Sequence, residues 1–170
     1  MWQIILAPLF VAAFPAGFAL AQAPEPTVGL DAPQWRVFSD ESGTRVDFPA
    51  GIFSVDAGPS PRGNGRELRS ADERARLMVY VEDNEEGYTP ASFIRTQFKA
   101  PRSELDYNRV SDRFFAISGV NGDQIYYSRC NFPFGTAGPI HCIYVAYPEE
   151  EKRLWDPIVT RISLSLRPLR

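Results

Sequence analysis

Apolar and polar residues alternate along several short stretches of this chain, which is the period-2 pattern of β-strands whose two faces differ. The first two stretches, 35–38 and 44–48, flank a polar segment that ends in Gly43, and they predict a hairpin. A register that pairs position 37 with position 46 gathers four apolar side chains on one face: Trp35, Val37, Val46 and Phe48.

A second pair of alternating stretches covers 66–70 and 75–83 and predicts two further strands. In the longer stretch, three aliphatic residues alternate with two larger ones: Leu77, Val79 and Val81 with Met78 and Tyr80. The segment 57–65 just before this pair is rich in Gly and Pro, so we expect a long loop there.

The stretch from 113 to 147 contains three strand patterns separated by two turn signals. Asn121-Gly122 favours a two-residue hairpin turn, and the Pro- and Gly-rich segment 131–141 favours a longer hairpin loop. One face of the resulting meander carries Phe115, Ile117, Tyr126, Cys130, Cys142 and Tyr144, and the other carries Phe114, Ala116, Ile125, Tyr127, Ile143, Val145 and Tyr147. Since both faces are largely apolar, we expect helices or loops to cover both.

Two helices interrupt the strand patterns. Thr89 has the residue type of an N-cap and Pro90 suits the first helical position, so a helix is expected over 91–99. A second helix is expected to begin after Pro148 and to continue towards Ile162.

Asp156-Pro157 predicts a kink or a restart within the second helix, and 163–167 is expected to form a closing strand. Taken together, the elements predict an α+β fold. Its antiparallel sheet has about six to eight strands, built from hairpins and a three-stranded meander, and two helices pack against it.

The first 23 residues are uncharged and almost entirely apolar. Their apolar core, 4–20, is short for a membrane span, which takes roughly 20 residues, and it contains two prolines and a glycine. We therefore predict a secretory signal peptide over 1–21, with cleavage before Gln22 or, almost equally well, after Ala23. An uncleaved N-terminal anchor is the alternative.

Residues 22–34 are rich in Pro and Ala and lack periodicity, which predicts an extended leader. Residues 35–168 then form a single α+β domain, long enough for one core. The protein is expected to be periplasmic or secreted, without stable membrane insertion after signal cleavage. Its formal net charge of −3 argues against a nucleic-acid partner.

The chain has two cysteines, Cys130 and Cys142, and an even count in an exported protein favours a disulfide. A hairpin register that pairs the two positions brings their Cα atoms within the distance that a disulfide tolerates. Closing so short a loop stabilises the fold by about 3 kcal/mol in the chain-entropy model. A structural disulfide is therefore expected, with a redox-active pair and free thiols as alternatives.

A resemblance to a known fold is carried by three sets of positions: Trp35-x-x-Phe38-x-Asp40-x-x-Gly43-x-x-Val46-x-Phe48-Pro49, the helix and the segment after it up to Tyr107, and Tyr147-Pro148 followed by a helix and Ile162-Ser163-x-Ser165-Leu166. Over roughly residues 33–168 the chain resembles the PsbP-like fold superfamily. This superfamily includes the photosynthetic oxygen-evolving P subunit, a Ran-binding nuclear import factor and bacterial DcrB-like envelope proteins. The resemblance implies a protein that binds other proteins or helps to assemble them, and it brings no shared set of catalytic residues.

A hydrolytic site would have to use His141, because it is the only histidine. The predicted registers align His141 with Asn131 and Asp112 in one polar row at a sheet end. This row is the best candidate for chemistry, and the alternative is a strand terminus where polar side chains meet water. Cys142 points to the opposite face from His141, which argues against a Cys-His pair.

One histidine and two cysteines that are expected to be oxidised do not supply the four ligands of a structural zinc site. The carboxylates of 82–87 lack the spacing of an EF-hand loop. We therefore expect no catalytic residues, no metal and no cofactor.

Two surfaces are candidates for binding. One is an aromatic groove for a hydrophobic ligand or a peptide, formed by residues that would otherwise be core: Tyr126, Tyr127, Tyr144 and Tyr147. The other is a basic patch for anionic envelope components or an acidic partner at Arg66 and Arg69, which would otherwise be exposed positions on a sheet edge.

Our preferred hypothesis is an exported, non-catalytic binding or assembly module of the bacterial cell envelope that contacts other, still unidentified envelope proteins. The alternative is a periplasmic carrier of a small hydrophobic or lipid-like ligand. The third hypothesis is a hydrolase-like enzyme that uses His141.

Overall fold

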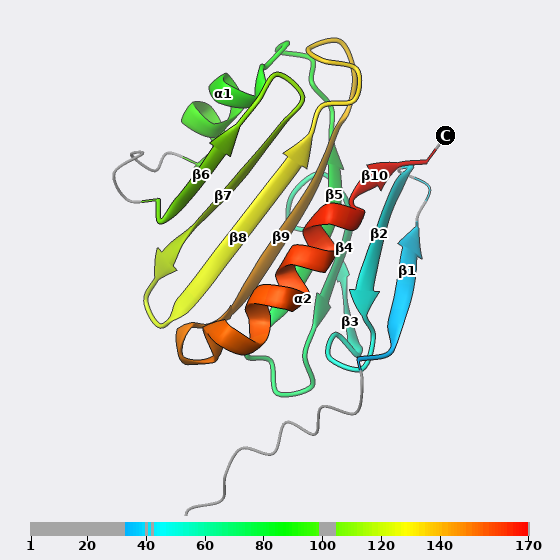
Figure 1. The fold of residues 1–170 in the computed structure, drawn as a ribbon. Helices are drawn as coiled ribbons and strands as arrows, with labels where there is room; N and C mark the ends of the chain where they lie inside the picture. Colours follow the sequence, from blue (N-terminus) through cyan, green and yellow to red (C-terminus); the bar gives the residue numbers. More distant parts are fainter. Residues whose placement is uncertain (1–32, 40, 42, 99–104, 170) are drawn as a thin grey trace, which may run out of the picture. The chain divides into compact units, whose positions relative to one another are not determined.

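A computed structural model describes residues 33–169 of the chain except 40, 42 and 99–104. Ten strands form two antiparallel sheets (Figure 1). The large sheet contains, in spatial order, β3 (Val55–Pro59), β4 (Asn64–Arg69), β5 (Arg76–Glu82), β9 (Ile140–Pro148), β8 (Gln124–Asn131), β7 (Phe114–Asn121) and β6 (Tyr107–Val110). The small sheet contains β1 (Trp35–Ser39), β2 (Thr44–Pro49) and β10 (Arg167–Pro168).

Helical segments follow β5 and β9. The first is a short α-helix, α1 (Pro90–Phe93), that continues as a π-helix, η1 (Ile94–Phe98). The second is a 3₁₀ turn, η3 (Glu149–Glu151), that leads into α2 (Lys152–Ser165). The α+β fold with an antiparallel sheet and two helices is thus confirmed. The expected signal peptide and nearly all of the expected leader lie outside the described residues, and those boundaries stay predictions.

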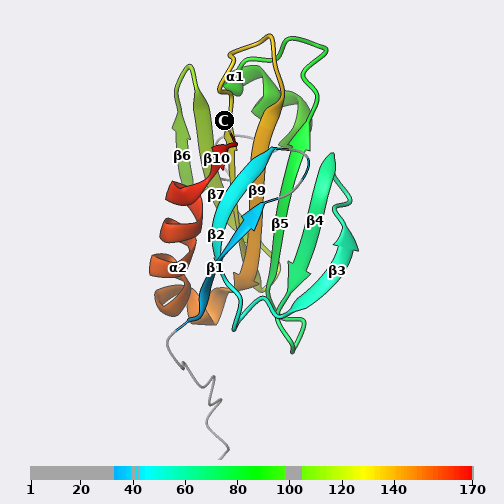
Figure 2. The same cartoon turned by 90° about the vertical axis from the view of Figure 1, so that its right-hand side faces the viewer.

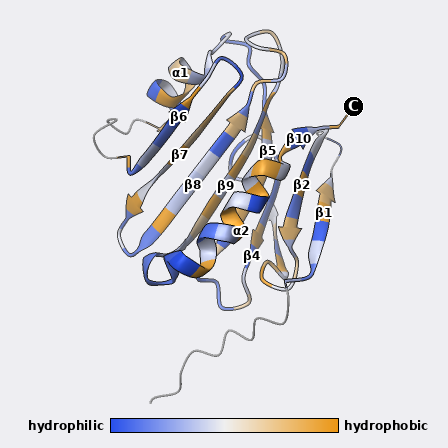
Figure 3. Ribbon diagram, viewed as in Figure 1, coloured by the Kyte–Doolittle hydropathy of each residue, from blue (hydrophilic) through white to orange (hydrophobic). Residues whose placement is uncertain are grey.

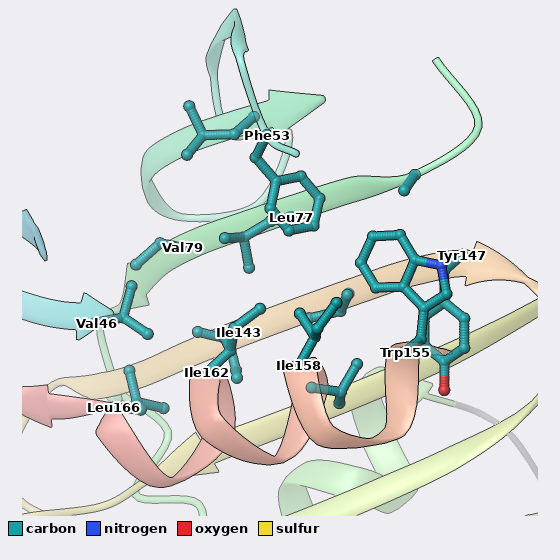
Figure 4. Close-up of a cluster of buried hydrophobic side chains, with 14 of the residues drawn as sticks. Val46, Phe53, Leu77, Val79, Ile143, Tyr147, Trp155, Ile158, Ile162 and Leu166 are labelled. Atoms are coloured by element: carbon teal, nitrogen blue, oxygen red, sulfur yellow. The ribbon is translucent and has the colours of Figure 1, made fainter. Parts of the chain in front are cut away.

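The small sheet and α2 lie side by side on one face of the large sheet (Figure 2). They bury the larger of two hydrophobic clusters, in which the ring of Trp155 on α2 stacks on Tyr147 of β9 at 5.2 Å and contacts Phe53 at 5.8 Å (Figure 4). Apolar residues of α2 at helical spacing face this cluster: Trp155, Ile158, Val159 and Ile162. α2 therefore anchors this face of the sheet.

α1 and η1 cover one end of the opposite face, where the second cluster lies. Thr89 caps α1 as predicted, because its side chain accepts a hydrogen bond from the backbone of Ser92 and the Ser92 side chain bonds back to Thr89. Phe93 packs against the rings of Phe115 and Phe132, each with its centroid 5.9 Å away. Both sheet faces are thus covered in part by other elements, as their apolar patterns predict.

Two predicted registers differ from the observed ones. Phe38, rather than Val37, lies opposite Val46, so Phe38 packs against the core and Val37 is 48% exposed. A one-residue slip exchanges the two faces of a strand, and burying the larger ring favours the observed pairing. In the β7–β8 hairpin the loop is Gly122-Asp123 rather than Asn121-Gly122, with Gly122 at a φ of +66° as in type II′ turns. This shift by two positions leaves each predicted face unchanged.

Two edge strands replace segments that the sequence analysis treated as irregular. β3 takes the first three residues of the predicted loop 57–65, because a bulge between Asp56 and Gly58 lets a Gly- and Pro-containing segment pair at a sheet edge. β6 forms the other edge and was not predicted.

α2 continues through Pro157 to Ser165 without the predicted restart, which leaves only a two-residue closing strand, β10. Pro157 has no N–H that could donate to the backbone carbonyl of the residue four positions earlier. Because Pro157 is on the exposed side of α2, water can donate to that carbonyl instead. None of the helices in the described part of the chain has the length and apolar character that crossing a membrane requires.

Candidate functional site

The disulfide occupies the predicted position. Cys130 and Cys142 are directly opposite each other on β8 and β9, with Cα atoms 4.1 Å apart, and both are fully buried in the second cluster. A bond in this position links adjacent strands and has no access to solvent, so its geometry supports a structural role.

His141 is buried beneath the small sheet and is only 3% exposed. Its Nδ1 lies 2.8 Å from the hydroxyl oxygen of Thr44, a fully buried residue of β2. Asn131 lies opposite His141, as predicted, and its side-chain amide donates a hydrogen bond to the carbonyl of Leu166. The expectation of a solvated strand end is therefore wrong, because these polar residues join the two layers of the fold.

Asp112 does not belong to this row. It is exposed in the turn before β7, and Phe114 takes the position opposite Asn131 because the β7–β8 register differs by two. A substrate could reach His141 and Thr44 only if β2 moved away. Within the described residues no group of three or more His, Cys, Asp or Glu is arranged to hold a metal ion.

The four tyrosines divide between the two sheet faces and do not line one groove. Tyr126 and Tyr144 stack in parallel with ring centroids 6.2 Å apart on one face. On the other face, Tyr147 packs under Trp155, and the Tyr127 hydroxyl lies 2.7 Å from the Ser163 hydroxyl of α2. Tyr127 and Tyr147 therefore take part in anchoring α2, and both also line a cleft beside this helix.

Arg66 and Arg69 belong to different faces of β4, and each has a carboxylate partner. Arg66 pairs with Asp56 across the β3–β4 ladder at 2.6 Å, and Arg69 pairs with Glu67 at 2.8 Å. The backbone amide of Gly58 and the guanidinium of Arg66 lower the pKa of the Asp56 carboxyl. These contacts neutralise the predicted basic patch locally.

A cleft of about 410 Å³ lies between α2 and strands β6, β7 and β8. It exists because α2 crosses β9 and β8 and leaves β6 and β7 uncovered (Figure 1). Hydrophobic and hydrophilic residues are interleaved along the elements that border it (Figure 3). Tyr107 of β6 is 44% exposed and Leu164 of α2 is 73% exposed, so apolar surface meets solvent at this cleft.

One end of the cleft holds two arginines over a single aromatic ring. The guanidinium carbons of Arg109 and Arg129 lie 5.4 Å and 4.5 Å from the ring centroid of Phe114. Arg129 also donates hydrogen bonds to the side chains of Asn131 and Ser163. Neither arginine forms an ion pair with any residue in the described part of the chain.

The other end of the cleft is electrically balanced. Lys152 and Asp156 of α2 pair at 2.8 Å, four residues apart on the helix. Burial raises the pKa of Tyr147 to about 12, and it also raises the pKa of Tyr127, so both hydroxyls stay neutral at neutral pH. Positive charge is therefore concentrated at the end with Phe114.

Three residues of this cleft were not indicated as site residues by the sequence patterns: Arg109, Phe114 and Leu164. Arg109 lies on the unrecognised strand β6, and Phe114 was assigned to an apolar face on the assumption that this face is covered. Tyr107-Asn108-Arg109-Val110 does not alternate between apolar and polar residues, so the strand-favouring residue types Tyr107 and Val110 were the available signal for an additional strand.

The fold is similar to the solution structure of cyanobacterial PsbP (CyanoP) from Synechocystis sp. PCC 6803, with a TM-score of 0.58. The two chains are 14% identical, and the similarity covers 82% of this chain and 95% of that one. Neither a comparison with protein families nor one with curated proteins gives a match. The similarity confirms the resemblance suggested by the sequence at the level of architecture: this chain has a PsbP-like fold.

Proposed function

We propose that this protein is an exported, non-catalytic binding or assembly module of the bacterial cell envelope, which contacts another protein through the cleft between α2 and β6–β8. The observation that carries the proposal is the part of the large sheet beside α2, where Tyr107, Leu164 and Arg109 are exposed next to the half-buried Arg129. Neither arginine has an ion-pair partner within the described chain. Tyrosine and arginine are among the residues that contribute most to protein interfaces, so an exposed Tyr107 close to two arginines suits an interface.

Two further features support the proposal. The only histidine, His141, is enclosed between the sheets and bonded to Thr44, an arrangement that suits a link between layers better than a general base. The uncharged, apolar N-terminal 23 residues and the buried disulfide fit an oxidising, exported location.

Two exposed leucines of α2 provide a matched test. Leu164 borders the cleft, whereas Leu154 is 50% exposed on the same helix and does not line it. Tagged wild type, Leu164→Glu and Leu154→Glu would each be expressed in the native host, cross-linked with formaldehyde and purified from the exported fraction. Their cross-linked products would be identified by mass spectrometry.

We expect a defined protein to be cross-linked to wild type and to Leu154→Glu, and to be lost with Leu164→Glu. Circular dichroism and thermal unfolding would verify that all three proteins are equally folded. A product that Leu164→Glu retains at wild-type level would contradict the assignment of the cleft as the interface.

A further inference from the structure

We propose that the cleft recognises an acidic segment of the partner protein, and that Arg109 and Arg129 together donate hydrogen bonds to one of its carboxylates above Phe114. This inference rests on the proposed function and names the chemistry of its partner. An arginine pair of this kind suits a carboxylate because guanidinium groups bind carboxylates with two parallel hydrogen bonds.

The charge distribution is the first argument. Three arginines elsewhere in the large sheet and its loops have carboxylate partners within the chain: Arg66, Arg69 and Arg74. Arg109 and Arg129 have none within the described residues, and both border the same cleft. Arg62, Arg76 and Arg113 also form no ion pair with a described residue, but they do not line this cleft. Asp106 also borders the cleft without forming an ion pair, and Asp156 is compensated by Lys152. An anionic side chain from outside would complement the arginine end.

The orientation of Arg129 is the second argument. Its Nε donates to the Asn131 side chain at 3.0 Å, and one terminal nitrogen lies 3.5 Å from the Ser163 hydroxyl. The remaining terminal nitrogen has no hydrogen-bond partner in the described part of the chain, and the ring of Phe114 supports the guanidinium plane. A group held in this way loses little side-chain entropy when a ligand binds.

The mixture of polar and apolar residues in the cleft favours a peptide over a lipid chain. Arg109 and Phe114 lie at one end, the Lys152–Asp156 pair lies at the other, and the exposed rims are Tyr107 and Leu164. An acyl chain along this path would cover charged groups without bonding to them, which is costly. A peptide can place a carboxylate on the arginines and aliphatic side chains on the two rims.

A peptide titration tests the inference on the folded chain purified without its first 21 residues. Three capped seven-residue probes share a leucine-rich sequence and differ only at the central position, which is Glu, Gln or Lys. Nuclear magnetic resonance would follow the backbone amides and the arginine Nε protons at 50 mM and 300 mM salt. Sodium laurate would serve as a lipid-like probe.

We expect the Glu peptide to bind about tenfold more tightly than the Gln peptide, with shifts centred on Arg109, Arg129 and Leu164, because a hydrogen-bonded charge pair is lost in the Gln peptide. Arg109→Gln should remove this preference, and 300 mM salt should weaken it. Arg95→Gln, which alters an exposed arginine on η1, should retain it. Arg129→Gln is a second variant, used after its amide spectrum has shown a native fold.

Equal binding of the Glu and Gln peptides, binding of laurate as tight as that of the Glu peptide, or no shift in the cleft at millimolar peptide would each overturn the inference. The proposed function is tested separately, and it fails if Leu164→Glu retains the cross-linked product at wild-type level. If Leu164→Glu still abolishes cross-linking to the host partner while Arg109→Gln leaves it intact, the cleft is an interface but an acidic segment is not what it recognises.

Discussion

The two edges of the large sheet use arginine in different ways. At the β3–β4 edge, Arg66 forms an ion pair with Asp56 on the neighbouring strand. At the β6 edge, Arg109 and Arg129 lie over Phe114 and have no carboxylate partner within the described residues. The same side chain thus joins strands at one edge and presents charge to solvent at the other.

The layers above the sheet explain this difference. α2 and β2 cover the middle of one face, so residues of β5 and β9 there are fully buried. No described element packs over β6 and β7 on that face to the same extent, and Phe114 and Ser118 of β7 stay half-buried at the cleft. Substitutions of residues buried between α2 and the sheet should therefore lower stability, whereas substitutions of residues at the cleft beside α2 should weaken binding.

The largest loss of stability is expected from Trp155→Ala, on the buried side of α2. It removes a buried indole that packs on Tyr147 and Phe53, which should lower the free energy of unfolding by about 3–5 kcal/mol. Urea denaturation followed by fluorescence would measure the change. Leu154→Ala, on the exposed side of the same helix, is the control and should cost less than about 0.5 kcal/mol. A loss for Trp155→Ala as small as that of the control would contradict the assignment of α2 as the anchor.

Removal of the disulfide should have the second largest effect. The double substitution Cys130→Ala and Cys142→Ala should reduce stability by about 3 kcal/mol, because the unfolded chain regains the freedom of an open loop. Calorimetry of the oxidised protein, the reduced protein and the double variant would test this, with similar values expected for the last two. An unchanged unfolding temperature after verified reduction would argue against a stabilising role.

Thr44→Val should have an intermediate effect, since it removes the hydroxyl that bonds to His141 while keeping the volume of the side chain. Removing one partner of a buried hydrogen bond lowers the free energy of unfolding by about 1–2 kcal/mol. Urea denaturation would give the value, and Val37→Thr at an exposed position of β1 is the control. No measurable loss would mean that the two sheets are held together without this bond.

Arg66→Gln should have a small, pH-dependent effect on stability. The pKa of Asp56 is lowered in the folded protein, so its contribution is present at pH values above the ordinary aspartate pKa of 3.8 and is lost as the pH falls through the lower, folded pKa. Because the pair is exposed, the loss at pH 7 should be below about 1 kcal/mol. Denaturation at pH 7 and pH 2.5 would show whether the difference from wild type disappears in acid. A difference that persists at pH 2.5 would show that it does not come from the ion pair.

Arg109→Gln should have the smallest effect on stability, within about 0.5 kcal/mol, because the exposed arginine has no carboxylate partner in the described chain. The same substitution should weaken binding of an acidic peptide about tenfold. Thermal unfolding and the peptide titration, measured on one preparation, would separate the two effects. A destabilisation larger than that of Arg66→Gln would contradict the contrast between the edges.

The sequence predicted the elements whose patterns are strong and local. Thr89-Pro90 identified the start of α1, and the two-residue period placed Cys130 opposite Cys142 and sorted the meander residues onto the correct faces. In the meander, alternation fixed the face of each strand but left the register open by two positions, which is why Asp112 was wrongly aligned with Asn131.

The cleft could not be predicted because it depends on where α2 lies across the sheet. A sequence pattern shows that a strand face is apolar, but it does not show how much of that face a helix covers. The sequence therefore did not distinguish Phe114, which lines the cleft, from Ile143, which is buried in the core. The sequence also does not show which exposed arginine has a carboxylate partner. The pairing of β3 with β4 places Asp56 beside Arg66, and no such partner lies beside Arg109 within the described residues.

Site-specific photo-cross-linking at the two edges tests the central claim most directly. A benzophenone amino acid would replace Leu164 beside the cleft in one protein and Val55, an exposed residue of edge strand β3, in another, and both would be irradiated in the native host. We predict a discrete cross-linked protein from position 164 that is absent from position 55. Cross-linking of the same protein from position 55, with none from position 164, would contradict the account.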